Sequence, residues 1–162
     1  MAKTKANKEK STDILALIEA EHRQVENLLA EAEKSKGAKL VEQFNKIYIA
    51  VILHARTEEL VFYPALREYE ETEQYVEEAE EEHEEVSFIL EEIKALKPTN
   101  PEFKEKMLEL KETLEHHVQE EESEIFNAVR ECMSDKELTE LGQEFQETKD
   151  KLVSNVEAAL AM

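Results

Sequence analysis

The 162-residue chain has few of the residues that bend or cross-link a backbone. It contains two glycines, three prolines and no tryptophan, so it has few places to turn and we expect a small number of long helices. Cys132 is the single cysteine, which excludes an internal disulfide and favours a reducing compartment. No apolar run approaches the ~20 residues of a membrane span, and the first ten residues, MAKTKANKEK, lack the apolar stretch of a secretory signal. We therefore predict a cytoplasmic protein with a disordered basic tail over residues 1–11.

Positive charge is also scarce. The chain has 40 acidic residues against 20 lysines and arginines, a formal net charge of −20. Such a surface repels nucleic acid and anionic membranes at long range. We accordingly expect neither a nucleic-acid partner nor a membrane partner.

Start and stop signals divide the chain into five helical segments. Pro64 is expected to kink or break the second, Thr99 with Glu102 forms a candidate capping box for the fourth, and Ser134 with Glu137 forms one for the fifth. The expected ranges are about 12–34, 38–69, 73–97, 101–133 and 134 to near the end.

Apolar residues recur every three or four positions along the first four segments. This pattern and the short connections predict an all-α fold, in which residues 12–133 form an up-down-up-down antiparallel four-helix bundle. Residues 134–162 form a further amphipathic helix, which we expect to pack on the bundle or on a partner, including a second copy in a homo-oligomer.

Each of the four apolar stripes carries a histidine. They are His22, His54, His83 and His117, and Glu58 and Glu121 follow the second and fourth by four residues. Counted from the turns, all four histidines fall within about one helical turn of the same height. Buried unpaired carboxylates are costly unless positive charge lies between them, and imidazole and carboxylate groups ligate divalent first-row metals. One such histidine alone would be read as structural, but coincidence on four helices predicts a site for two metal ions.

The chain also contains an internal repeat. AEHRQVENLL (20–29) aligns with EEHEEVSFIL (81–90), and HARTEELVFYPAL (54–66) aligns with HVQEEESEIFNAV (117–129). The two halves are thus predicted to be helical hairpins related by a pseudo-twofold axis, each with one lone histidine and one H-x-x-x-E pair.

These motifs resemble those of the hemerythrin-like family, also called hemerythrin HHE cation-binding domains. The resemblance covers residues 12–133 through EHRQVENLL, HARTEELVFYPAL, EAEEEHEEV and HHVQEEESEIF. It implies a non-haem diiron centre bridged by Glu58, Glu121 and an oxo or hydroxo group, although purified protein could carry manganese or zinc. The implied ligands are His22, His54, Glu58, His83, His117 and Glu121. Oxygen-carrying members have a second histidine where this chain has Ser87, so the set here is four histidines and two glutamates.

Four further residues are candidates for a role beside the ligands. Glu26 repeats the H-x-x-x-E spacing after His22, as a further ligand, as a base that orients a histidine, or as a residue on the solvent side, and the first two are favoured. Glu59 and Glu122 follow the two bridging positions in both halves. Tyr48, like Tyr63, approaches the centre or packs in the core.

The resemblance implies a protein that binds or reacts with oxygen, nitric oxide or peroxide, in oxidative or nitrosative stress. Whether it only binds or also turns over such a ligand as an enzyme is open at this point, as is its redox partner. Iron storage or sensing, and oxygen-activating oxidation of an organic substrate, are the alternatives.

Overall fold

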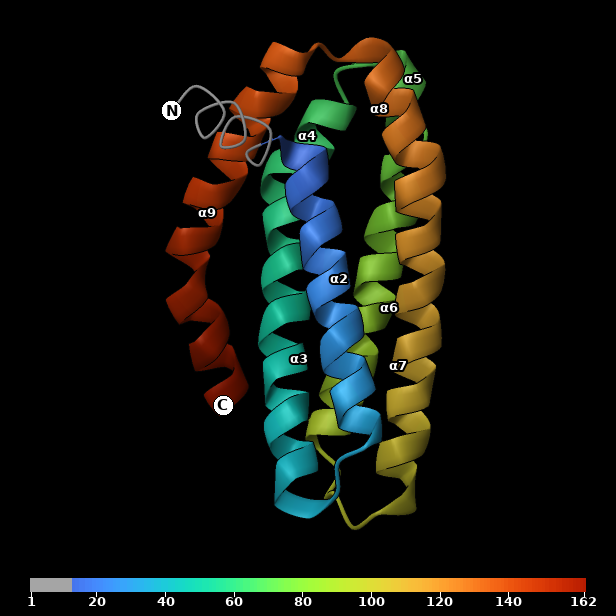
Figure 1. The fold of residues 1–162 in the computed structure, drawn as a ribbon, viewed down its shortest axis with the longest axis vertical. Coiled ribbons are helices and arrows are strands. Elements are labelled where there is room, and N and C mark those ends of the chain that lie inside the picture. Colours follow the sequence, from blue (N-terminus) through green and yellow to red (C-terminus); the bar gives the residue numbers. More distant parts are fainter. Residues whose placement is uncertain (1–12) are drawn as a thin grey trace, which may run out of the picture.

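The computed structural model describes residues 13–162, and this part of the chain contains helices and no strand. Its long helices α2 (Ile14–Glu33), α3 (Gly37–Thr57), α6 (Val76–Lys94) and α7 (Pro101–Glu120) lie side by side and run in alternating directions (Figure 1). The prediction of an all-helical fold is confirmed. The tail predicted over residues 1–11 and the helix start at Thr12 lie outside the described residues.

Side-chain caps fix where the helices begin. Asp13 accepts hydrogen bonds from the backbone N–H groups of Leu15 and Ala16 at the start of α2. Ser134 accepts from the N–H of Glu137, as its capping box predicts. For α7 the prediction of Thr99 was wrong: the Asn100 side chain accepts from Glu102 N at 2.9 Å. Asn100 directly precedes Pro101, so its short side chain reaches the unpaired N–H groups of the first turn.

Both halves contain a π-helical segment that starts at a predicted bridging glutamate. One spans Glu58–Phe62 and continues as α4 (Tyr63–Leu66); the other spans Glu121–Ile125 and continues as α8 (Phe126–Cys132). The irregularity expected at Pro64 therefore lies one turn earlier. It also occurs in the second half, where no proline follows, so the proline is not its cause. Wide π turns of this kind are frequent at functional sites.

The connection after α4 also differs from the prediction. The second helical stretch ends at Leu66 rather than near residue 69, and a short helix α5 (Glu70–Glu73) precedes α6. The Thr72 hydroxyl donates to the Leu66 carbonyl at 2.6 Å and is fully buried, so this turn is fixed internally.

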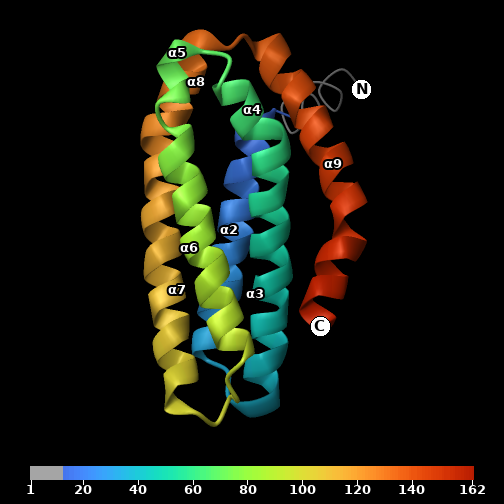
Figure 2. The ribbon, with the colours of Figure 1, turned by 180° about the vertical axis from the view of Figure 1, so that it is seen from behind.

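Two apolar clusters fill the bundle, one on each side of the histidine level. One contains residues such as Leu29, Phe44, Leu90 and Phe103, and the other contains Ile18, Phe62, Phe126 and Phe145 among its members. Helix α9 (Asp135–Ala161) supplies Phe145 and runs back along the outside of α2 and α3 (Figures 1 and 2). None of the helices within the described range is long and apolar enough to cross a bilayer.

Candidate metal centre

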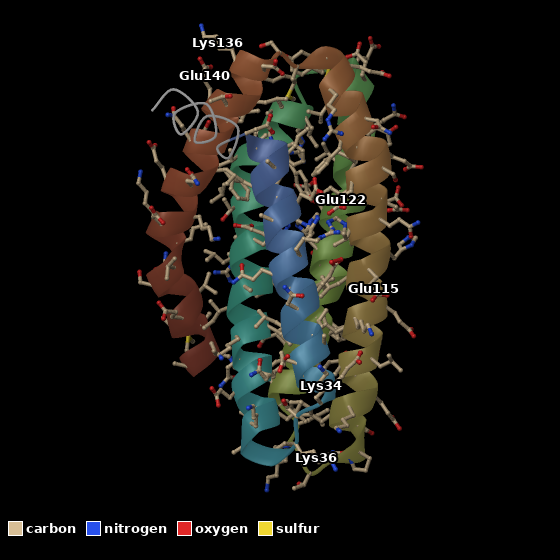
Figure 3. The ribbon with its side chains drawn as sticks, in the orientation of Figure 1. Lys34, Lys36, Glu115, Glu122, Lys136 and Glu140 are labelled. Atoms are coloured by element: carbon tan, nitrogen blue, oxygen red, sulfur yellow. The ribbon has the colours of Figure 1, made fainter. Side chains whose placement is uncertain are left out.

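The four stripe histidines and the two glutamates come together between the two apolar clusters. His22, His54, His83 and His117 project from α2, α3, α6 and α7, and Glu58 and Glu121 project from the first residues of the π-helical segments. All six are buried, and both glutamates are 0% exposed. Figure 3 shows side-chain nitrogens gathered between the helices at the level of the labelled Glu122.

Each glutamate faces one histidine nitrogen from each half of the chain. Glu58 Oε1 lies 3.1 Å from His54 Nε2 and 3.2 Å from His83 Nε2. Glu121 lies 3.0 Å from His22 Nε2 and 3.7 Å from His117 Nε2.

The six residues form two groups, each of which could hold one metal ion. His22, His54 and Glu121 form the first, and Glu58, His83 and His117 form the second, with ligand atoms within 4.8 Å of one another. Glu58 also faces His54 of the first group, and Glu121 also faces His117 of the second. Both carboxylates therefore occupy positions from which they can bridge two ions.

The outward nitrogen of every histidine lies against a carboxylate. The Nδ1 atoms of His22, His54 and His117 lie 2.6 Å from oxygens of Glu122, Glu21 and Glu82, and His83 Nδ1 lies 2.9 Å from Glu59. A carboxylate acceptor places the proton on Nδ1, which leaves the lone pair of Nε2 directed inward.

The inward-facing atoms lack partners. Among residues 13–162, Nε2 of His22, His54 and His117 and both oxygens of Glu58 and Glu121 are buried without a hydrogen bond. Lone pairs that face one another at about 3 Å are unfavourable unless a cation or a proton lies between them. This donor set of imidazole nitrogens and carboxylate oxygens fits divalent first-row metal ions.

The close approach of these six side chains also shifts their pKa values. Burial alone would lower the pKa of His83, but its contact with Glu58 and its hydrogen bond with Glu59 outweigh burial and raise that pKa to about 9. Burial would raise the pKa of Glu58, yet the nearby charges of His54 and His83 hold it well below its usual range. Burial and the nearby charge of Glu58 raise the pKa of Glu121.

Of the four carboxylates that contact a histidine Nδ1, two were named as candidates from the sequence and two were not. Glu59 and Glu122, the candidates, hold His83 and His22. Glu21 and Glu82 were missed, because they lie off the apolar stripes. Both directly precede a stripe histidine and align in the internal repeat, which is the signal that could have identified them.

Two candidates form no recorded contact with the four histidines or the two bridging glutamates, although Glu26 lines a small cavity beside them. Glu26 is 42% exposed and pairs with Arg23 at 3.2 Å, because an ion pair at the surface avoids burying its charge. The Tyr48 hydroxyl donates to Glu91 at 2.7 Å, and its ring packs in the cluster that contains Phe44. Tyr63 does reach the centre: its hydroxyl lies 3.0 Å from His83 Nε2.

A buried layer of imidazoles and carboxylates with unpartnered inward atoms defines a metal-binding helical bundle. The chain matches the family described as Hemerythrin HHE cation binding domain over residues 13–129, and it belongs to that family. It is also 33% identical over 152 residues to a protein named "DNA nickase" from Nostoc sp. (strain PCC 7120 / SAG 25.82 / UTEX 2576). That match covers 93% of this chain but 43% of the relative, so the chain spans less than half the relative's length. No solved structure matches the chain.

Proposed function

We propose that the centre holds two iron ions, bridged by Glu58, Glu121 and an oxo or hydroxo group, and that it binds or reacts with a small oxidant. The oxidant is oxygen, nitric oxide or peroxide. His22 and His54 would hold one ion, and His83 and His117 the other, in an antiparallel up-down-up-down bundle. The iron pair supplies two electrons that can be exchanged with the ligand, and an unidentified redox partner would restore them.

The main support for this proposal is a small cavity beside the centre. Its volume is about 30 Å³, and its lining includes His22, His54 and His117. Glu26 and Glu115 also line it, and the rest of the wall is apolar, formed by Val25, Leu29, Val51, Leu114 and Val118. A cavity of this size has room for a molecule as small as a diatomic gas or peroxide.

The protein's own residues would orient the ligands and exclude water. The four carboxylates on Nδ1 hold the imidazole rings in one orientation and make them stronger ligands. The apolar clusters above and below the layer lower the local dielectric. The Tyr63 hydroxyl, which contacts His83 Nε2 here, would become available as a hydrogen-bond donor once a metal takes that lone pair.

Iron storage or sensing is the second candidate function. It is favoured by the contact between Glu21, which holds His54, and Lys149 on α9, because this contact connects the centre to the outer helix. The name of the Nostoc relative concerns a much longer protein. On this chain the net charge of −20 opposes association with DNA, so we do not extend nicking to it.

The proposal is tested by loading the protein anaerobically with Fe²⁺, removing excess metal, counting iron and following the absorption spectrum as air, nitric oxide or peroxide is admitted. Two irons per chain and a new iron-to-ligand absorption band are expected. A band that reverses when the gas is removed indicates binding, and catalytic loss of peroxide indicates turnover. Iron that is retained without any spectral response would contradict the proposal and favour storage.

The variant Val25→Leu adds a methylene to the wall of the small cavity. We expect unchanged iron content with at least about tenfold weaker ligand binding, because the space is lost. Val153→Leu is the matched control, since Val153 is a partly buried residue of α9 that lies outside that cavity. Equal effects of the two variants would rule out the cavity as the ligand site.

A further inference from the structure

A second and much larger cavity reaches the centre from the opposite face of the bundle. It lies between α3 and α6, the two helices in front of α2 in Figure 2, and has a volume of about 520 Å³. His54, His83 and His117 form part of its wall, together with apolar side chains such as Val51 and Leu114. The cavity therefore extends from the surface to ligands of both groups.

The internal repeat explains why the bundle is open on this face and closed on the other. On the α2 side, Arg23 bonds to Glu122 at 2.5 Å and to Glu26 at 3.2 Å, which covers the outer side of His22. Glu84 and Ser87 occupy the aligned positions on the α6 side. A glutamate cannot form that bridge to Glu59, the residue aligned with Glu122, so the α3–α6 face lacks this cover.

The mouth of the large cavity is strongly acidic. Five glutamates line it, and Arg56 is the single lysine or arginine in the lining; the five are Glu59, Glu77, Glu80, Glu81 and Glu84. Glu59 and Glu80 are engaged with His83 and Arg67. Within the described part of the chain the other three form no ion pair, so their charges are uncompensated.

Buried, unpartnered nitrogens lie at the inner end of the same cavity. Nε2 of His54 and of His117 has no hydrogen-bond partner in the described structure, and the two residues are 8% and 4% exposed. A positively charged ligand that entered this cavity would first meet carboxylates at the mouth and then histidine nitrogens without hydrogen-bond partners at the inner end.

We propose that this cavity is the route by which a divalent metal cation reaches the centre, with Glu77, Glu81 and Glu84 attracting it. This inference rests on the metal centre of the proposed function. A divalent ion with six waters occupies roughly 180 Å³ at about 30 Å³ per water, which the cavity accommodates. The carboxylates raise the local concentration of the hydrated cation, and the histidine nitrogens replace its waters at the inner end.

The test is the rate at which metal-free protein takes up Fe²⁺ alone under anaerobic conditions, with a chromogenic chelator trapping the unbound ion at set times. In Glu77→Gln/Glu81→Gln/Glu84→Gln we expect uptake to slow about tenfold at low ionic strength and the difference to shrink at high salt. The final iron content should equal that of the unmodified protein.

The control is Glu131→Gln/Glu144→Gln/Glu147→Gln, which changes the net charge equally at exposed positions outside the cavity. Equal slowing in both triple variants would overturn the proposal, because only total charge would then matter. Unchanged uptake in the first variant would overturn it as well.

A second variant is designed to cover the mouth of the large cavity while Glu77 and Glu81 keep their charges. Glu84→Arg/Ser87→Glu copies the Arg23 and Glu26 arrangement onto the α6 side, and we expect slower uptake with unchanged capacity. If uptake is unaffected while the protein still binds two irons and responds to an oxidant, the route is wrong and the proposed function stands. If the unmodified protein takes up no iron, the proposed function is wrong, and the entry route is wrong with it.

Discussion

Lys149 on α9 lies 2.5 Å from one oxygen of Glu21, and the other oxygen of Glu21 lies 2.6 Å from Nδ1 of His54. Burial raises the pKa of Glu21, but His54 and Lys149 together lower it overall, so the carboxylate stays ionised. Glu82, aligned with Glu21, holds His117 and pairs with no lysine of residues 13–162. The outer helix is thereby connected to one of the four histidines.

Removing this lysine should weaken metal binding. In Lys149→Met we expect metal affinity to fall a few-fold, since Glu21 loses a partner that keeps it oriented toward His54. Competition with a metal chelator measures the change. Lys136→Met is the control, because Lys136 is also on α9 but is 86% exposed. Equal affinities of the two variants would show that α9 does not act on the centre.

The carboxylates on Nδ1 should matter more than the lysine. We expect Glu82→Ala to lower metal affinity about 10- to 100-fold while leaving two ions per chain at saturation, because it orients a ligand without being one. Glu85→Ala removes an exposed charge from the same helix and should change little. A titration at several chelator concentrations separates affinity from stoichiometry, and loss of one whole equivalent in Glu82→Ala would contradict the assignment.

Tyr63 distinguishes the two halves of the centre, since the aligned residue in the second half is Phe126. Tyr63→Phe should retain both metal ions and release a bound small ligand about tenfold faster, because one hydrogen bond to it is lost. Stopped-flow dissociation measures this. Tyr48→Phe also removes a hydroxyl, but one that bonds to Glu91 away from the centre. Similar rates in both variants would argue against a role for Tyr63 at the ligand.

Metal removal should make stability depend on pH. In the metal-free protein the pKa of His83 is raised from 6.5 to about 9 by Glu58 and Glu59, against the effect of burial. The resulting stabilisation is fully present below pH 6.5 and is lost as pH rises through 9. We therefore expect the Tm of chelator-treated protein to fall over this window and that of metal-loaded protein to fall less, because metal replaces the proton. Parallel falls in both forms would exclude this coupling.

The repeat of histidines and glutamates on apolar stripes was sufficient to predict the helices and the layer at which these residues meet. Periodicity determines which side of a helix faces the core, and four helices of similar length place equivalent positions at one height. The π-helical segments were not predictable in this way. Their apolar residues continue the helical spacing, so nothing in the pattern marks the wide turns at Glu58–Phe62 and Glu121–Ile125.

Contacts between side chains of different helices also could not be predicted from the sequence. Glu21 reaches His54 and Glu82 reaches His117 because of the distance between neighbouring helices, which periodicity within one helix does not specify. Of the three readings of Glu26, its 42% exposure and its pairing with Arg23 fit the solvent-side one, because a four-residue spacing does not by itself direct a side chain inward. The prediction that nucleic acid is not a partner stays a prediction.

The central claim is that six residues hold a pair of metal ions, and an anaerobic Fe²⁺ titration with the endpoint counted per chain tests it most directly. The unmodified protein should bind two ions, and Glu58→Ala and Glu121→Ala should each bind one or fewer, because each carboxylate faces histidines of both groups. An endpoint of two that survives in both variants would contradict the assignment of the bridging ligands. An unmodified protein that binds no iron would contradict the account as a whole.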